Sequence, residues 1–399
     1  MGMGENAAFK PIAFRNIAVH ENDGWFCDIY YDGLFHIDLR TGMISLEFFF
    51  GTNQIEAYSP IAYYEEKLII APRNADSILI YDIVKKHAER IRLNMSENYV
   101  GNDLLHFFSA IEVYGRYAYI FPGRYHAIIR INLENYEIKY IEGWYSQIKS
   151  ILPQKTEAKR VIFCDWVEKV GENRFVLVCW QTNLIMLFDA GTEKYQFIRI
   201  GLPDKALASV IYKENEKVVS YRDENLLTIF PERREVDLSE YNEKGGVCIF
   251  DIGAKWFATS IAGGRVIVID KETERKEIYI DFSENQEEVQ EPPYYMSCRK
   301  KVEDKCIILS VITNGKVAII DIANNHVAMF DLKLSDVDKQ SIVNYRQNLK
   351  LKSKRFLETE RFTLKDLVGT LKHDKIMKFA DSEFLPCGEL IFSELKKEM

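Results

Sequence analysis

Four arginines occupy the same kind of position, a short polar segment between two apolar runs: Arg73, Arg124, Arg222 and Arg265. A guanidinium group offers a planar fork of N–H donors, so it suits bidentate recognition of a carboxylate or a phosphate. Further residues with ligand-binding side chains lie in or beside such segments: Asn74, Trp180, Asn183 and Asn314. We predict that these residues bind an anionic small molecule, a glycan or a partner protein. The alternative is that each arginine is a solvated turn residue paired with a nearby acid.

Candidates for catalysis are fewer. His126 is the best acid–base candidate, because imidazole titrates near neutral pH, although a lone histidine in a turn is more often incidental. The sequence contains no G-x-S-x-G elbow, no P-loop and no G-x-G-x-x-G motif. It also lacks C-x-x-C, H-x-H and H-E-x-x-H spacings. We therefore expect no metal and no cofactor, and the sequence favours a non-catalytic role while leaving catalysis open.

The composition limits the classes of partner and the cellular compartments that fit this chain. The chain carries 52 Lys and Arg against 60 Asp and Glu, a net charge of −8, which disfavours a nucleic-acid partner. No apolar run approaches the ~18–20 residues of a membrane-spanning helix. The seven cysteines are an odd number, and several lie inside apolar runs, as Cys164, Cys179 and Cys248 do. This cysteine pattern is typical of buried reduced thiols and predicts a cytoplasmic protein. Because the chain has no spanning run, we also expect no membrane partner.

A loose internal repeat contains these positions. At seven places an acidic or amide residue, here called the repeat anchor, ends an apolar run: Asp38, Asp82, Asn132, Asp189, Glu232, Asp270 and Asp321. In six copies a basic residue opens the preceding apolar run 15 or 16 positions earlier: Lys67, Arg116, Arg174, Lys217, Lys255 and Lys305. The anchors are separated by 44, 50, 57, 43, 38 and 51 residues, which lies in the range of propeller blades.

Each copy has the same internal order. Four short runs rich in β-branched and aromatic residues are separated by polar turns, which indicates strands rather than helices. The second and third runs are joined by the segments that hold the arginines, here called elbows. Asp and Asn suit the anchor because their side chains can accept a hydrogen bond from the backbone two residues on. Four antiparallel strands per copy, repeated seven times, predict an all-β, seven-bladed β-propeller, with six or eight blades also compatible.

The anchor corner Ile269-Asp270-Lys271-Glu272-Thr273 resembles the β-propeller superfamily with YVTN, PQQ-type and WD40-like repeats. The resemblance covers roughly residues 12–335 and concerns architecture, because neither the Trp-Asp ending of WD40 repeats nor the double glycine of kelch repeats recurs. It implies that the elbows and the connections between blades gather on one face around a central channel. The candidate ligand-binding residues would then converge on that face.

The pattern changes after Ser335, so we divide the chain into propeller repeats over 1–335, a basic helical appendage over 336–378 and a closing strand segment over 379–399. The appendage carries eleven Lys and Arg against six Asp and Glu, which leaves −13 on the rest of the chain. Its apolar residues recur at helical spacing: Ile342, Tyr345, Leu349 and Phe356. It would pack on the propeller or contact an acidic partner; its mixed charges argue against a membrane helix.

Two further expectations concern the appendage and the ends of the chain. Thr363-Leu-Lys-Asp366 resembles a capping box that opens a second short helix. A strand near residues 11–18 and another at residues 389–393 would complete one shared blade, because closure of the ring removes exposed strand edges. The two ends of the chain would then lie close together.

Two functions fit these observations. The first is a non-catalytic binding or scaffold protein that recognises a partner protein or an anionic ligand on the face formed by the elbows. The alternative is a propeller enzyme of lactonase or lyase type acting on a sugar or a small anionic metabolite, with His126 and the elbow arginines in its site. The alternative depends on analogy at the level of the fold.

Overall fold

The fold comes from a computed structural model. It describes residues 10–52, 54, 56–100, 106–151, 163–179, 182–241, 246–260, 264–282, 296–302, 305–311 and 315–345. The chain divides into two compact units, Met1–Asp338 and Lys339–Met399. The first unit contains seven antiparallel sheets, each made of four consecutive strands.

The strands of the first four sheets are β1 (Phe14–His20), β2 (Asp23–Asp28), β3 (Gly33–Asp38), β4 (Ile44–Phe49); β5 (Tyr58–Tyr64), β6 (Lys67–Pro72), β7 (Ser77–Asp82), β8 (His87–Arg92); β9 (Phe108–Tyr114), β10 (Tyr117–Pro122), β11 (Ile128–Asn132), β12 (Ile138–Ile141); and β13 (Phe163–Val170), β14 (Arg174–Cys179), β15 (Leu184–Asp189), β16 (Lys194–Arg199). Two short helices lie in the connections between sheets, α1 (Glu97–Val100) and α2 (Trp144–Ile151).

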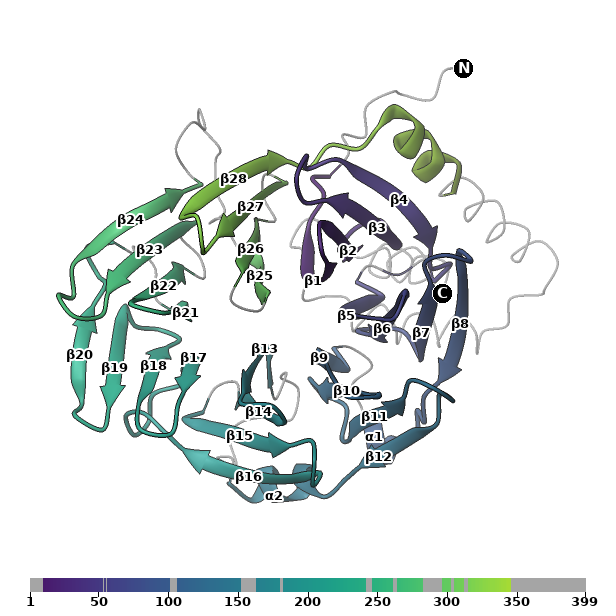
Figure 1. The fold of residues 1–399 in the computed structure, drawn as a ribbon. Coiled ribbons are helices and arrows are strands. Elements are labelled where there is room, and N and C mark those ends of the chain that lie inside the picture. The colour runs from purple at the N-terminus through teal and green to yellow at the C-terminus, as the bar shows by residue number, and fades with distance from the viewer. Residues whose placement is uncertain are drawn as a thin grey trace, which may run out of the picture. The chain divides into compact units, whose positions relative to one another are not determined.

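The remaining sheets are built from β17 (Leu207–Tyr212), β18 (Lys217–Tyr221), β19 (Leu226–Phe230), β20 (Arg234–Asp237); β21 (Val247–Ile252), β22 (Lys255–Ser260), β23 (Arg265–Asp270), β24 (Lys276–Asp281); and β25 (Met296–Val302), β26 (Cys306–Val311), β27 (Lys316–Asp321), β28 (His326–Asp331). Within the first unit, β1 packs against both β5 and β25, so the first and last sheets are neighbours (Figure 1). The unit is therefore a closed seven-bladed β-propeller, as the repeat predicted.

Burial falls from the inner strands of a blade to its outer strand. In the second blade, β6 and β7 are buried along almost their whole length, whereas β8 alternates between exposed and half-buried residues. This gradient follows from the architecture, because an inner strand has neighbouring blades on both faces, as in sheets covered on both sides. The sequence encodes it as continuous apolar runs such as Leu68–Ala71, followed by the polar outer run His87–Arg92.

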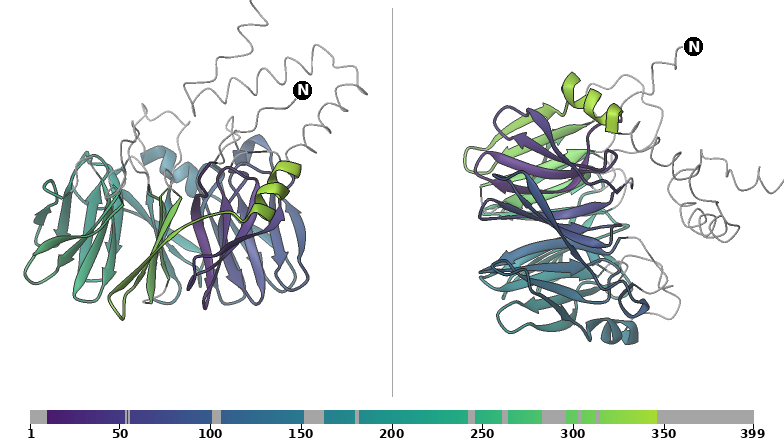
Figure 2. Two further views of the ribbon diagram at one scale, coloured as in Figure 1. Left: turned by 90° about the horizontal axis from the view of Figure 1, so that it is seen from above. Right: turned by 90° about the vertical axis from the view of Figure 1, so that its right-hand side faces the viewer.

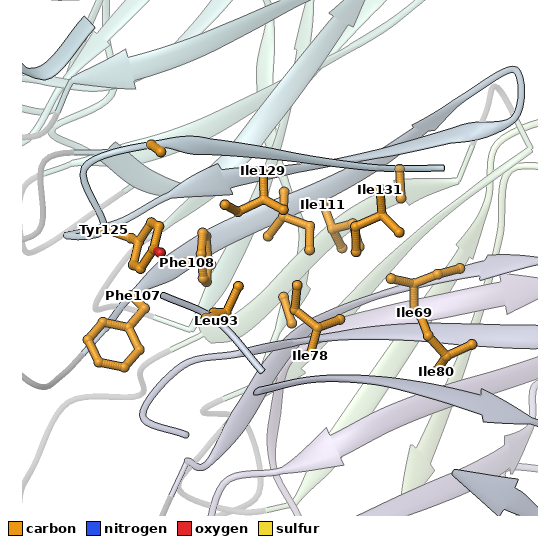
Figure 3. Close-up of a cluster of buried hydrophobic side chains, with 14 of the residues drawn as sticks. Ile69, Ile78, Ile80, Leu93, Phe107, Phe108, Ile111, Tyr125, Ile129 and Ile131 are labelled. Carbon is orange, nitrogen blue, oxygen red and sulfur yellow. The ribbon is translucent and has the colours of Figure 1, made fainter. Parts of the chain in front are cut away.

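The hydrophobic core is distributed between the blades. Figure 3 shows the cluster between the second and third blades, where Ile69, Ile78 and Ile80 face Ile111, Ile129 and Ile131. Equivalent clusters lie between other neighbouring blades. Each blade can bury its apolar faces only against its neighbours, so the seven blades stabilise one another.

The repeat anchors have the predicted role. The third strand ends at the anchor in six blades, at Asp38, Asp82, Asn132, Asp189, Asp270 and Asp321. Each of these side chains accepts a hydrogen bond from a backbone N–H two or three residues on, at 2.8–3.0 Å. Blade five differs, because β19 ends at Phe230 and Glu232 lies in the following turn. The proline at 231 has no N–H for the strand ladder, which ends the strand early.

The ends of the repeat region match the prediction in part. The N-terminal strand exists as β1, displaced by two or three residues from the predicted range. Residues 336–345 are helical, and Ser335 caps this helix: its Oγ accepts from Asp338 N at 3.1 Å and donates to Asp338 Oδ2 at 2.7 Å. The predicted capping box at 363–366 and the closing strand at 389–393 lie outside the described residues. Every blade, the first and the last included, has four strands of its own from residues 14–331.

The cysteines and the helices also bear on the sequence predictions. Cys27, Cys164, Cys179, Cys248 and Cys298 are buried free thiols, and Cys306 is a half-buried one. Burial raises the pKa of Cys298 to about 12, so this thiol is unreactive at neutral pH. Cys387 lies outside the described residues. Among the residues that the structure describes, no helix is both long and apolar enough to cross a membrane.

Candidate functional site

The topology gives the central channel two chemically different ends. Every blade begins at its innermost strand, so the elbows and the connections between blades lie at one end, here called the elbow end. The turns between the first and second strands, and between the third and fourth, lie at the opposite end, here called the hairpin end. Figure 2 shows α2, which lies in the connection between the third and fourth blades, on one side of the ring. Six of the predicted ligand-binding residues are described and lie at the elbow end, where the topology puts them on one face: Arg73, Asn74, Arg124, Asn183, Arg222 and Arg265.

Backbone hydrogen bonds hold the elbows of the second and third blades against the blade connections beside them. Arg73 N donates to Ala57 O at 2.9 Å, and Phe107 N donates to Arg73 O at 2.8 Å. The next elbow repeats the pattern, since Gly123 N donates to Phe107 O at 2.8 Å. A Cβ at Gly123 would lie 2.4 Å from His106 O, so this position requires glycine. The elbows of the second and third blades are therefore held in fixed positions.

An arginine pair shares one carboxylate at this end. Arg73 Nε donates to Glu56 Oε2 at 3.0 Å, and Arg15 donates to Glu56 Oε1 from Nε at 3.1 Å and from Nη2 at 2.7 Å. The side chain of Arg73 is 4% exposed and that of Glu56 is 14% exposed, whereas that of Arg15 is 27% exposed. Burial would raise the pKa of Glu56, but the charges of Arg73 and Arg15 outweigh it and lower the pKa to about 2.

His106 and Asn74 complete this cluster. Arg73 Nη2 lies 2.7 Å from His106 Nδ1. A guanidinium only donates, so Nδ1 accepts and the neutral ring carries its proton on Nε2. Asn74 Oδ1 accepts from His106 N at 2.9 Å, which ties the elbow to the residues before β9. Glu56 and His106 each lie two residues before the first strand of their blade and have positive φ angles of 52° and 60°, which non-glycine residues rarely adopt.

The remaining predicted residues have varied surroundings. Arg124 N donates to His106 O at 2.9 Å, so its backbone adjoins the cluster, and its Nε atom is buried. Arg222 is half-buried, and its N–H donates to Ala206 O at 2.9 Å. Arg265 Nε donates to Asp281 Oδ2 at 2.8 Å, as the alternative interpretation of a paired arginine requires. Asn183 Oδ1 accepts from Arg199 Nη1 at 2.8 Å. Trp180 and Asn314 lie outside the described residues.

His126 is part of an aromatic stack at the elbow end. Its ring lies 3.6 Å from that of Tyr145 at an interplanar angle of 14°. Its Nδ1 lies 2.7 Å from Asn98 O, and since a carbonyl only accepts, Nδ1 carries a proton. The neighbouring Trp144 is fully buried between the third and fourth blades. Trp144 is therefore a core residue and cannot serve as a platform for a ligand.

At the hairpin end, charged side chains from several blades meet in the channel. Lys213 and Lys271 both contact the carboxylate of Asp251, at 2.6 and 2.8 Å, and Lys301 Nζ donates to Asp251 O at 2.7 Å. Lys300 on β25 lies 3.2 Å from Glu112 on β9, across the channel. The Lys300–Glu112 ion pair thus connects two blades that share no packing interface.

Glu168 on β13 is the unusual member of this group. Its Oε2 atom is buried, and this oxygen has no hydrogen-bond partner within the described part of the chain. Burial raises the pKa of Glu168 to about 8; the nearby charge of Asp251 also raises it, and those of Lys301 and Lys213 lower it. The Glu168 carboxyl is therefore largely protonated at neutral pH.

Several of these residues were not found from the sequence. Arg15, Glu56, His106 and Glu168 are single charged or titratable residues in or just before an innermost strand, and they belong to no motif. The available signal was an ionisable residue interrupting an apolar run, as Arg15 does between Phe14 and Ile17. Among the described residues, no group of three or more His, Cys, Asp or Glu side chains is placed to hold a metal.

No protein-family model matches this sequence, and no curated protein matches it. Solved structures show the same fold. A catalytically inactive virginiamycin B lyase from Staphylococcus aureus with quinupristin has a TM-score of 0.56 and 12% identity, covering 79% of this chain and 97% of that one. YCF48 from Cyanidioschyzon merolae also has a TM-score of 0.56 and 12% identity, covering 79% of this chain and 97% of that one. One of these proteins is an enzyme by its name, and at such identities the likeness concerns the fold alone.

Proposed function

We propose that the protein is a binding protein that recognises an anionic ligand, or an acidic segment of a partner, at the elbow end of its channel. The observation that carries this proposal is the cluster of Arg15, Arg73 and His106 around Glu56. Two guanidinium groups share one carboxylate there, and the backbone of Arg124 adjoins the same cluster. The described residues of the cluster hold two guanidinium groups against one carboxylate, in a chain whose net charge is −8.

The residues of this site divide into two roles. Arg73 and Asn74 are braced by the backbone and by His106, so they position the site. Arg15 is the most exposed arginine of the cluster and is suited to contact a ligand, because an arginine fork can bind a carboxylate or phosphate in bidentate geometry. A cytoplasmic location is part of the same proposal, since buried free thiols are typical of reducing compartments.

The test is a thermal-shift screen of the purified protein against sugar phosphates, nucleotides, oligosaccharides and carboxylates. A ligand at ~100 times its Kd stabilises the folded state by about 2.7 kcal/mol. For a ligand that gives a shift, Arg15→Gln should weaken binding about tenfold or more, the effect of losing a charged hydrogen bond. Arg40→Gln is the matched control, because Arg40 is 70% exposed in a hairpin-end turn and pairs with Asp38. Equal affinities of the two variants would refute the site.

The alternative function is a lyase or lactonase with His126 as its acid–base residue. A turnover measurement distinguishes this enzyme from a binding protein. Any ligand found in the screen is incubated with the protein, and its conversion is followed by mass spectrometry. Conversion by the wild type that is lost in His126→Asn would support the enzyme. Binding without conversion would support the binding protein.

A further inference from the structure

The arginine cluster at the elbow end contains a side chain that can change its charge near neutral pH. An imidazole titrates between about pH 5 and 8, so His106 can take up a proton in this range. The guanidinium groups of Arg15 and Arg73 stay charged throughout it. The carboxyl of Glu56 stays ionised, because its pKa is about 2. Among these four residues, His106 alone therefore responds to mildly acidic pH.

The contact between Arg73 and His106 requires a neutral ring. Arg73 Nη2 lies 2.7 Å from His106 Nδ1. The guanidinium only donates, so Nδ1 must offer a lone pair. A protonated imidazole carries a hydrogen on both ring nitrogens and can accept no hydrogen bond. The two groups would also then be cations, which repel at this distance. Protonation of His106 therefore breaks this contact.

The backbone keeps the two residues close even when their side chains separate. Phe107 N donates to Arg73 O at 2.8 Å, and Arg124 N donates to His106 O at 2.9 Å. Asn74 Oδ1 accepts from His106 N at 2.9 Å, which joins the elbow to the residue before Phe107. A protonated His106 therefore stays beside the Arg73 guanidinium. An anion between two such cationic donors can accept a charge-assisted hydrogen bond from each of them.

The other charged groups around His106 belong to the same cluster. Glu56 is close enough for a positive charge on His106 to lower its pKa. Both oxygens of this carboxylate already accept from arginine, Oε2 from Arg73 and Oε1 from Arg15. An anion from solution is therefore a suitable acceptor for the donors that protonation releases. His106 is half-buried, so solvent reaches part of it.

We propose that the elbow end binds an anion together with a proton, and that His106 takes up this proton. The inference depends on the proposed function, because it concerns the ligand of the same site. His106 is a positioning residue: its neutral ring holds the Nη2 group of Arg73, and its protonated ring releases this group and adds a positive charge. The proton and the anion must strengthen each other's binding by the same factor, because linkage is reciprocal. Anion affinity therefore rises as the pH falls.

Sulfate is the appropriate probe, because its charge is constant between pH 5.5 and 7.5. Its affinity is measured by isothermal titration calorimetry at both pH values and constant ionic strength. The wild type should bind sulfate about tenfold more tightly at pH 5.5, the effect of one further positive charge near the anion. Titrations in buffers with different ionisation enthalpies should show that the protein takes up protons as sulfate binds.

His106→Asn separates the proton from the contact. Asparagine keeps an oxygen acceptor near the place of Nδ1, tolerates the positive φ of 60° and does not titrate in this range. This variant should bind sulfate equally at both pH values and without proton uptake. His87→Asn is the matched control, because His87 is exposed on β8. It should keep the pH dependence of the wild type.

Arg15→Gln distinguishes the two ways to fail. If no sulfate binding depends on Arg15 at either pH, the proposed function is wrong, and the role of His106 is wrong with it. If the binding depends on Arg15 but has the same affinity at both pH values, only the role of His106 is wrong. The same follows if His106→Asn keeps the pH dependence, or if the wild type binds sulfate without proton uptake. The proton measurement uses the wild type, so it does not require the variant to fold.

Discussion

Lys300 Nζ lies 3.2 Å from Glu112 Oε1, so an ion pair crosses the central channel from the last blade to the third. The two residues are 188 positions apart, and their blades are separated by the first and second blades around the ring. Both side chains are about a quarter exposed, at 27% and 26%, so water partly screens their attraction. The pair complements the hydrophobic clusters between neighbouring blades, because it links blades with no common core.

This cross-channel pair should contribute modestly to stability. We expect a double-mutant cycle with Lys300→Gln and Glu112→Gln to give a coupling free energy of about 0.5–1 kcal/mol, the upper part of the range for exposed pairs. The coupling should shrink in high salt, because salt screens partly exposed charges. Denaturant unfolding of the four proteins measures it. Additive effects of the two substitutions would show that the pair contributes nothing.

Arg73 should matter much more, because it is buried beside a buried carboxylate. Arg73→Met removes one partner of Glu56 and leaves its charge with Arg15 alone. Breaking a buried ion pair in this way costs about 3 kcal/mol. Arg40→Met is the matched control and should change the free energy of unfolding by less than about 0.5 kcal/mol, since Arg40 is 70% exposed. Comparable losses in the two variants would contradict the structural role of Arg73.

The arginine cluster should also determine part of the acid sensitivity. The pKa of Glu56 is lowered from 4.5 to about 2 in the folded protein, so the unfolded chain binds a proton more readily than the folded protein between these values. Its contribution to stability is complete above pH 4.5 and is lost as the pH falls towards 2. The lost contribution is about 3 kcal/mol. Glu56→Gln should flatten the stability profile between pH 4.5 and 2, and an unchanged profile would contradict the pKa.

The anchor turns offer a test at the level of local structure. Asp270 Oδ1 accepts hydrogen bonds from both the backbone N–H and the hydroxyl of Thr273, each at 2.8 Å. Asp270→Ala removes this acceptor, whereas Asp270→Asn keeps one in the same place. We expect the alanine variant to have the lower Tm of the two. Equal Tm values measured by circular dichroism would show that the turn does not depend on the acceptor.

The fold could be predicted from the sequence because its main signals are local. An Asp or Asn that accepts from the backbone within three residues fixes a turn whatever surrounds it, so Asp82 and Asp270 marked the ends of their strands. The elbow face followed from topology once four strands per repeat were recognised. The anchor of blade five was misplaced by two residues, because the proline before Glu232 ends β19 early.

The charged clusters could be predicted only in part, because they depend on contacts between distant residues. Arg73 and Asn74 were found, since elbows carry a local signal. Their partner Glu56 was not, because its role depends on Arg15, 41 residues away. The same holds for Lys300 and Glu112, which only the closure of the ring brings together. A charged residue within an innermost strand is the signal that would have indicated both channel ends.

Glu168 should limit stability at alkaline pH, with the opposite sign to Glu56. Its pKa is raised from 4.5 to about 8 in the folded protein, so between these values the folded state keeps a proton that the unfolded chain has lost. Stability therefore falls as the pH rises through this range. Glu168→Gln removes the effect and should be more stable than the wild type by about 2 kcal/mol at pH 9, after allowance for partial screening by water, and equally stable at pH 4.

Denaturant unfolding at both pH values measures this difference. Glu172→Gln is the matched control, because Glu172 is exposed in the turn after β13, and it should not change the pH dependence. The measurement uses chloride buffers without sulfate or phosphate, so it reports the ionisation of Glu168 independently of any bound anion. If Glu168→Gln and Glu172→Gln follow the same profile from pH 4 to pH 9, the Glu168 carboxyl ionises as an exposed one does. In that case Glu168 Oε2 is hydrogen-bonded to water in the folded protein.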